Sequence, residues 1–347
     1  MITVALVISI TLVLGVIFVN GWTDAPNAIA TVVSTRCMSP RNAVIMAIIL
    51  NTIGAGVMTF FNASVAATIM RLVTFGDPSL TSGESADRAL MVLGVSLFAI
   101  VVWATAAWFF GIPTSESHAL IAGITGGAIA LGNGLGAINF AEWGKVLMGL
   151  GLSLLLGFFS GFFTAKVLML LFKAVRKATA DRFFTGGQIF GAGCMAFMHG
   201  AQDGQKFMGV FIIAVLLNQG TVPDPNVAYA IPWWLIILCS LVMGLGTSAG
   251  GYRIIKAVGM DMVKLEKYQG FAADLAAAGC LLLASLTGIP VSTTHTKTTA
   301  IMGVGSARRL TSVNWGVVKD MLLAWVLTFP GCGLISFIMV KIYLAFI

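Results

Sequence analysis

The stretch Asn20-Gly21-Trp22-Thr23-Asp24 returns later in the chain, in altered form, as His199-Gly200-Ala201-Gln202-Asp203. A second pair of stretches follows in the same order, Pro113-Thr114-Ser115-Glu116-Ser117-His118 and Pro290-Val291-Ser292-Thr293-Thr294-His295. The two aspartates are 179 positions apart (24 to 203), and the two histidines are 177 positions apart (118 to 295). Two unrelated motifs displaced by nearly the same amount indicate an internal repeat. The sequence therefore predicts two homologous halves, residues 1–172 and 187–347, joined by a linker at residues 173–186.

Long apolar segments surround these motifs. Of the 347 residues, 58% are hydrophobic and 10% are charged, whereas a soluble domain carries about 25% charged residues. Several nearly uncharged segments reach about 18 residues, the length that crosses a bilayer as a helix: 2–19, 43–61, 89–110, 146–165, 231–248 and 321–340. A lipid-facing backbone must satisfy its own hydrogen bonds, which favours helices. The sequence therefore predicts an all-α polytopic membrane protein.

Each half contains the same series of segments. A helix interrupted near the Asp (2–35 and 187–217) precedes one plain helix (43–61 and 231–248). Two segments joined at a Pro-Ser turn follow (89–131 and 271–304), and a long last helix closes the half (145–171 and 317–340). The Pro-Ser pair returns the chain to its starting side, whether it spans twice or re-enters. Each half then crosses an odd number of times, so we expect the second half to be inverted relative to the first.

The basic residues orient this arrangement. The formal net charge is +7, but the charges lie in short loops between apolar segments, where they set membrane orientation. We therefore expect a lipid bilayer as the partner and no nucleic acid. With residues 173–182 in the cytoplasm, both termini are extracellular in the cell (plasma) membrane, and the basic residues gather inside: Arg36, Arg41, Lys173, Arg176, Lys177, Arg182, Arg253, Lys256, Lys264, Lys267, Arg308, Arg309 and Lys319.

Inverted repeats with interrupted helices are typical of secondary transporters. Their sites lie near the bilayer midplane, where the helices break. This pattern predicts alternating access around a site between the repeats. A channel is an alternative that the repeat does not exclude, and a homo-oligomer is compatible with the sequence.

Asp24 and Asp203 are the leading candidates for that site. The other ionisable residues in apolar segments are Lys206, Glu116, His118, His295, Lys297 and Asp274. Ionisable groups in apolar segments cost about 2.5–3.5 kcal/mol each on insertion scales, so they are functional candidates by default. Gly21, Pro26, Gly200 and Gly204 disfavour a continuous helix, so we expect a break near each Asp. A break would let Asp24 hold a coupling cation, Na⁺ or H⁺, beside freed carbonyls and Asn27. The simpler alternative is that Asp24 only caps a helix.

Lys206 occupies the position that matches Asn27 in the first half. Three roles are open to a lysine at this place. It could offset Asp203 and so replace a bound cation, it could contact the substrate anion, or it could form an ion pair without touching the substrate.

The Pro-Ser motifs supply a group of hydroxyl donors where apolar segments begin. Hydroxyls and free N–H groups at one end of a segment suit a tetrahedral anion. The histidines of the two motifs could donate to the same anion, and the pKa range of imidazole would allow proton coupling. Ser, Thr and His also bridge transmembrane helices, which is the alternative. The candidate substrate-binding residues are Thr114, Ser115, Ser117, His118, Ser292, Thr293, Thr294 and His295, together with Lys206.

Residues 20–31, together with 199–206, resemble the inorganic phosphate transporter (PiT) family. The Pro-Thr-Ser-Glu-Ser-His and Pro-Val-Ser-Thr-Thr-His-Thr-Lys stretches are similar to that family's second paired motif. The resemblance implies a symporter of inorganic phosphate driven by Na⁺ or H⁺, with no other cofactor. It places Asp24, Asn27 and Asp203 at the family's signature Asp and Asn positions, so they become the candidate coupling-ion residues, with Na⁺ possible at Asp24 and Asn27.

The second motif departs from the family's pattern, because it has Gln202 before its Asp and Lys206 in place of Asn. The coupling ion therefore stays open between Na⁺ and H⁺. Some bacterial members of the family are associated with sulfate, so a sulfate permease on the same scaffold is the main alternative. An intramembrane aspartyl hydrolase using Asp24 and Asp203 is a remote one, since the paired Ser, Thr and His motifs have no role in it. We expect that the chain is not an enzyme.

Overall fold

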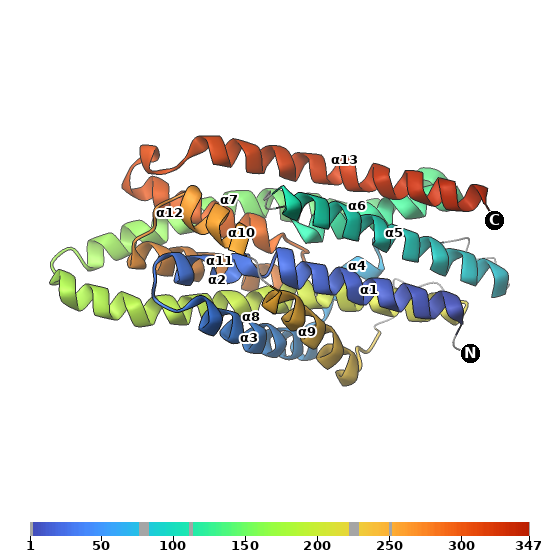
Figure 1. The fold of residues 1–347 in the computed structure, drawn as a ribbon, viewed down its shortest axis with the longest axis horizontal. Coiled ribbons are helices and arrows are strands. Elements are labelled where there is room, and N and C mark those ends of the chain that lie inside the picture. Colours follow the sequence, from blue (N-terminus) through green and yellow to red (C-terminus); the bar gives the residue numbers. More distant parts are fainter. Residues whose placement is uncertain (1–2, 76–82, 111–113, 222–228, 250–251, 347) are drawn as a thin grey trace.

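The computed structural model describes residues 3–75, 83–110, 114–221, 229–249 and 252–346. Within these ranges the chain is almost entirely helical and forms no strand, only two isolated bridges. Among the described residues, six helical spans are long and apolar enough to cross a membrane: Val4–Ser34, Pro40–Phe61, Ala86–Phe109, Phe140–Leu171, Lys267–Thr287 and Trp315–Ala345. The predicted all-α, multi-pass membrane fold is confirmed (Figure 1).

The first half begins with α1 (Val4–Thr23), α2 (Pro26–Ser34), α3 (Pro40–Phe61) and a short α4 (Ser64–Met70). It continues with α5 (Gly83–Phe109), α6 (Glu116–Ala128) and α7 (Phe140–Leu171), with the short helices η1 (Ile129–Asn133) and η2 (Gly134–Ala137) before α7. The second half contains α8 (Lys177–Asn218), α9 (Trp233–Ser248), α10 (Tyr252–Lys256) and η3 (Ala257–Asp261). It ends with α11 (Lys267–Thr287), α12 (Thr293–Arg308), η4 (Leu310–Ser312) and α13 (Trp315–Ala345). Helix α8 starts inside the predicted linker of 173–186.

The predicted break near Asp24 is present. Helix α1 ends at Thr23 and α2 starts at Pro26. The N–H of Ala25 reaches back five residues to the carbonyl of Asn20, at 3.2 Å. Pro26 has no N–H to continue the helical ladder, but its fixed φ suits the first turn of a new helix. The chain therefore turns at Asp24 and restarts as α2.

The predicted break near Asp203 is wrong, because α8 runs without interruption for 42 residues. The glycines of this motif serve packing instead. A Cβ on Gly200 would lie 2.0 Å from the carbonyl oxygen of Asn51 in α3, and one on Gly204 would lie 2.8 Å from the Cβ of Ala55. Small residues of this kind let transmembrane helices approach closely. Residues 198–214 are buried on every face, so α8 is the central helix of the molecule.

The packing partners of the two halves correspond. Helix α6 packs against α13, and its counterpart α12 packs against α7, so the last helix of each half holds the Pro-Ser segment of the other. In the same way α1 lies against α5 and α9, and α8 lies against α11 and α3. The two halves are thus interlocked, and segments from both meet in the middle.

The ends of the chain lie together. Both termini are at one end of the helix bundle, and the turn between α7 and α8 is at the opposite end (Figure 1). Large apolar side chains, such as Phe60, Phe159 and Val326, are exposed on the outer helices, whereas most of the polar side chains of the Asp and Pro-Ser motifs are buried. This distribution is the one that a surrounding lipid bilayer requires.

Candidate functional site

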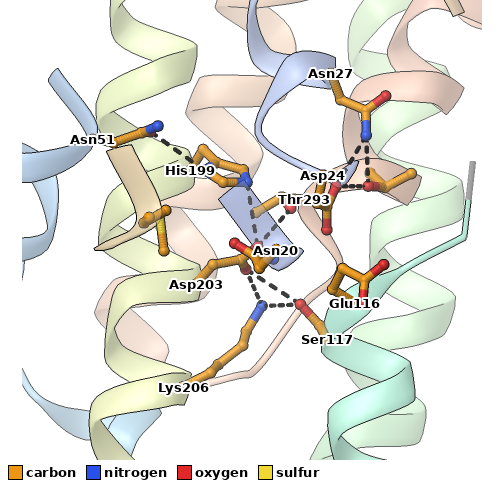
Figure 2. Close-up of polar contacts among 12 residues, drawn as sticks. Asn20, Asp24, Asn27, Asn51, Glu116, Ser117, His199, Asp203, Lys206 and Thr293 are labelled. Atoms are coloured by element: carbon orange, nitrogen blue, oxygen red, sulfur yellow. Dashed lines mark hydrogen bonds and ion pairs between the residues drawn. The ribbon is translucent and has the colours of Figure 1, made fainter. Parts of the chain in front are cut away.

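Four chain segments meet at the centre of the bundle: the α1–α2 break, the middle of α8, and the starts of α6 and α12 (Figure 2). Asp24 and Asp203 lie close together there. One side-chain ligand atom from each of Asp24, His199 and Asp203 is within 4.8 Å of the other two. All three side chains are fully buried. The two aspartates, which are far apart in sequence, therefore form one site.

Asp24 is held by neutral groups. Asn27 Nδ2 donates to Asp24 Oδ1 and to Thr294 Oγ1, at 3.0 Å each, and the Thr294 hydroxyl also donates to Asp24 Oδ1. Three oxygens of residues at the α1–α2 break have no hydrogen-bond partner among the described residues: Asp24 Oδ2, Asn20 Oδ1 and Asn27 Oδ1. Buried polar atoms are nearly always partnered. Carboxylate and amide oxygens are the ligands that hard cations prefer, so a small cation fits this place.

Asp203 is held differently, because a charged group reaches it. Lys206 Nζ lies 2.7 Å from Asp203 Oδ1, which also accepts from Ser117 Oγ at 3.2 Å. The other oxygen accepts from Asn20 Nδ2 at 3.2 Å and from Thr293 Oγ1 at 3.3 Å. Four segments of the chain thus converge on one buried carboxylate.

Lys206 was predicted among the substrate contacts, but protein oxygens surround its ammonium. Nζ donates to Asp203 Oδ1 at 2.7 Å, to Ser117 Oγ at 2.7 Å and to the carbonyl of Val291 at 2.6 Å. A lysine ammonium has three N–H groups. All three are therefore used within the protein.

The Pro-Ser motifs place two serines as helix caps. Ser115 Oγ accepts from the N–H of His118 at 3.3 Å, and Ser292 Oγ accepts from the N–H of His295 at 3.1 Å. These two matching contacts cap the N-termini of α6 and α12. In each of them the serine oxygen accepts, so the hydroxyl proton is still available to donate. Thr114 is also buried, whereas Pro113 lies outside the described residues.

His118 and His295 meet face to edge, with ring centroids 4.5 Å apart. The ring of Phe329 packs against His118 at 4.6 Å, and that of Trp325 packs against His295 at 3.9 Å. None of the four imidazole nitrogens has a hydrogen-bond partner among the described residues. Buried imidazoles with both nitrogens free are donors and acceptors available to a ligand.

Sequence reasoning missed two residues of this site and assigned no role to a third. Asn20 and His199 occupy matching positions at the start of the two Asp motifs, so the repeat itself could have identified them. His199 Nε2 is 3.3 Å from Asp203 Oδ2, and its Nδ1 is 3.3 Å from Asn51 Oδ1. The third is Glu116, whose Oε1 accepts from Thr23 Oγ1 at 3.0 Å while Oε2 has no partner among the described residues.

A second buried polar cluster joins helices α2, α8, α11 and α12. Its centre is Asp274 of α11, which pairs closely with Lys297 of α12. Thr31 of α2 donates to both carboxylate oxygens at 2.9 and 2.8 Å, and Gln188 of α8 donates at 2.6 Å. All four side chains are fully buried. The sequence singled out the two charged residues by their apolar surroundings, but it did not pair them.

The first half has no such cluster at the matching positions. The 177-residue offset relates Asp274 to Leu97 and Lys297 to Leu120. Both leucines are buried in one apolar cluster together with Val210, which the 179-residue offset relates to Thr31. The matching positions of the two halves therefore differ, since one set is made of charged and polar groups and the other of hydrocarbon.

Comparisons with known proteins agree over nearly the whole chain. The phosphate transporter family matches residues 20–336. A probable low-affinity inorganic phosphate transporter of Bacillus subtilis is 39% identical over 313 residues, which cover 90% of this chain and 89% of that protein. A protein of the same description from Rhizobium meliloti is 38% identical over 320 residues, covering 92% and 90%.

A solved structure, described as the sodium-dependent phosphate transporter, has the same fold. Its TM-score is 0.86 at 22% sequence identity, and the match covers 99% of this chain and all of the other. The family and the relatives are transporters, which confirms that the chain is not an enzyme and removes the aspartyl hydrolase alternative. The chain belongs to the phosphate transporter family.

Proposed function

We propose that the protein is a symporter that carries inorganic phosphate across the cell membrane, coupled to a cation that binds at Asp24. The observation that carries the proposal is the pairing of two unlike places in one buried site. Asp24, Asn20 and Asn27, at the α1–α2 break, each have an unpartnered oxygen among the described residues, and unpartnered imidazole nitrogens lie where α6 and α12 begin. A cation suits the first place and an oxyanion suits the second.

The proposed anion site uses the starts of α6 and α12. Ser115 and Ser292 each keep a proton to donate, and the helix starts add partial positive charge. His118 and His295 lie one turn further along and supply ring nitrogens that have no other partner among the described residues. Thr114, Ser117, Thr293 and Thr294 complete the set of hydroxyls, although the last three also serve the two aspartates.

The choice between phosphate and sulfate depends on whether the site offers a hydrogen-bond acceptor to the substrate. At neutral pH phosphate retains a hydroxyl that donates a hydrogen bond, whereas sulfate has none. Glu116 Oε2 is a buried carboxylate oxygen without a partner among the described residues, and it lies outside the proposed cation site. It suits a ligand that donates, so it favours phosphate. The descriptions of the curated relatives favour it as well.

The proposed cation site consists of Asp24, Asn27 and Asn20. The oxygen-rich surroundings favour Na⁺, and the description of the solved relative as sodium-dependent supports that choice. A proton on Asp24 is the second candidate, because it would also neutralise a carboxylate that only neutral groups contact within the described residues. The gradient experiment below distinguishes these two ions.

Alternating access between two inverted repeats fits the packing. Corresponding helices have corresponding partners in the two halves, and the site lies where the halves meet. The termini and the α7–α8 turn lie at opposite ends (Figure 1), and the positive-inside tendency favours a cytoplasmic turn. Lys177→Cys should therefore react with a membrane-impermeant thiol reagent only from the cytoplasmic side, and Phe346→Cys only from outside. Wild-type protein controls for the native cysteines, and the reverse pattern would contradict this orientation.

Uptake of radiolabelled phosphate into proteoliposomes tests the proposed function. Na⁺ and pH gradients should be imposed separately, with sulfate in excess as the competitor. We expect uptake driven by one cation gradient and little affected by sulfate. Uptake that sulfate abolishes would make the protein a sulfate permease, and uptake that ignores both gradients would make it a channel.

A further inference from the structure

We infer that Lys206 is a tethered cation, which stands in the second half of the site where the first half binds a free one. The inference rests on the proposed function and concerns its coupling. It predicts that the protein uses one free cation fewer than a site with asparagine at both positions would use.

The two halves present the same arrangement around different residues. Asp24 and Asn27 are three positions apart, as are Asp203 and Lys206, and the 179-residue offset relates the two pairs. In the first half the amide of Asn27 contacts Asp24 Oδ1 and leaves its own oxygen free. In the second half the ammonium of Lys206 fills the corresponding place beside its carboxylate.

The partners of Lys206 Nζ are those that a metal cation would take. They are a carboxylate oxygen of Asp203, a hydroxyl oxygen of Ser117 and the backbone carbonyl oxygen of Val291, at 2.6–2.7 Å. Carboxylate and carbonyl oxygens are typical ligands of hard cations. The ammonium therefore occupies an oxygen cage, and it does so with every N–H used, so none is left for the substrate.

Charge balance points the same way. A buried charge is costly unless it is paired. Asp203 has its counter-ion in Lys206, whereas Asp24 is hydrogen-bonded only to Asn27 and Thr294 within the described residues. His199 lies within 4.8 Å of both carboxylates, and its Nε2 is 3.3 Å from Asp203 Oδ2. Asp24 thus needs a cation from solution, and Asp203 does not.

Lys206→Asn tests the inference, because it gives the second half the residue pair of the first. The variant should require one more free cation. Cation dependence of phosphate uptake is measured in proteoliposomes for wild type, Lys206→Asn and Lys206→Arg. We expect the Hill coefficient for the driving cation to rise by about one in Lys206→Asn. Lys206→Arg, which keeps a tethered charge, should show the wild-type coefficient.

If Lys206→Asn no longer transports phosphate, an equilibrium measurement of its stability can still test the inference. Thermal unfolding of Lys206→Asn should depend more steeply on cation concentration than that of wild type, because a bound ion stabilises the folded state by mass action. Equal dependence in both proteins would overturn the inference. So would failure of both Lys206→Asn and Lys206→Gln to fold at high cation concentration, since a free cation should then replace the ammonium.

The remaining outcomes separate the two proposals. A uniform loss of phosphate affinity in Lys206→Asn at every cation concentration would overturn the inference, since it would show that the lysine contacts the anion. Wild-type protein that takes up no phosphate under any gradient would instead remove the proposed function, whatever the variant does.

Discussion

Asp24 and Asp203 occupy matching positions in the two halves, yet the chain around them differs. Asp24 lies where α1 ends and α2 restarts, and its hydrogen-bonding partners are neutral. Asp203 lies inside the unbroken α8 and is paired with Lys206. A broken helix offers free backbone groups to an ion from solution, and a helix that carries its own counter-ion has no such need. The comparison teaches that two matching sequence motifs can keep the position of a charge while they differ in how that charge is balanced.

The largest expected effect follows from Asp24→Asn, which keeps the size of the side chain and removes its charge. If the carboxylate holds the driving cation, gradient-driven uptake should be lost while phosphate binding in the absence of a gradient persists. Uptake and equilibrium phosphate binding are measured on the same preparation. A variant with wild-type, gradient-dependent uptake would mean that Asp24 is only part of a helix cap.

Asp203→Asn should instead act on stability. It leaves the Lys206 ammonium buried without its counter-ion, and breaking a buried pair in this way costs about 3–5 kcal/mol. Thermal or denaturant unfolding in detergent measures the loss. The double variant Asp203→Asn with Lys206→Met should recover much of it, because no unpaired charge remains. Equal stability losses from Asp24→Asn and Asp203→Asn would erase the difference between the two halves.

Ser115→Ala combined with Ser292→Ala should weaken phosphate binding on the order of a hundredfold, if each serine donates to a charged oxygen at about 1.5 kcal/mol or more. Non-additivity would reduce this figure. Each serine also caps a helix, and loss of a cap costs about 0.5–2 kcal/mol of stability. Asn139→Ala is the matched control, because Asn139 caps α7. A control that weakens phosphate binding equally would assign the whole effect to capping.

The smallest effects distinguish two adjacent threonines, each of which serves one carboxylate. Thr294→Val removes the hydroxyl beside Asp24 and should weaken binding of the driving cation by about tenfold, the loss of a hydrogen bond to a charged group. Thr293→Val removes a longer contact to Asp203 and should cost about 1 kcal/mol of stability with little change in cation affinity. Cation titrations and unfolding of both variants are compared. An exchange of these two phenotypes would contradict the assignment of the cation to Asp24.

Much of the fold could be predicted from the sequence, because the apolar segments and the offset motifs report it directly. The break at Asp24 was predictable from Pro26, whose missing N–H acts on its own helix. The role of Gly200 in helix packing was not predictable in this way. Its lack of a Cβ admits the Asn51 carbonyl of another helix, and a contact between helices leaves no mark in the local sequence.

The site was predictable to the same extent. Residues within the paired motifs do converge, as the matched spacing of these motifs predicts (Figure 2). Partners outside the motifs, such as Asn51 and Gln188, come from helix faces that tertiary packing alone brings to the centre. The saturation of the Lys206 ammonium depends on the carbonyl of Val291, and every residue has a carbonyl.

The contrast between the pair of Asp274 with Lys297 and the matching pair of Leu97 with Leu120 has a consequence for temperature. Exposing apolar surface to water raises the heat capacity, and exposing polar surface lowers it. The free energy of exposing the leucines to water would therefore curve strongly with temperature, and their contact would weaken on cooling. Opening past the ion pair would expose charged groups, whose hydration becomes less favourable as temperature rises. Warming would thus strengthen both contacts, but for different reasons. The leucines would be held more firmly by the hydrophobic effect, and the ion pair because hydration of its charges becomes less favourable.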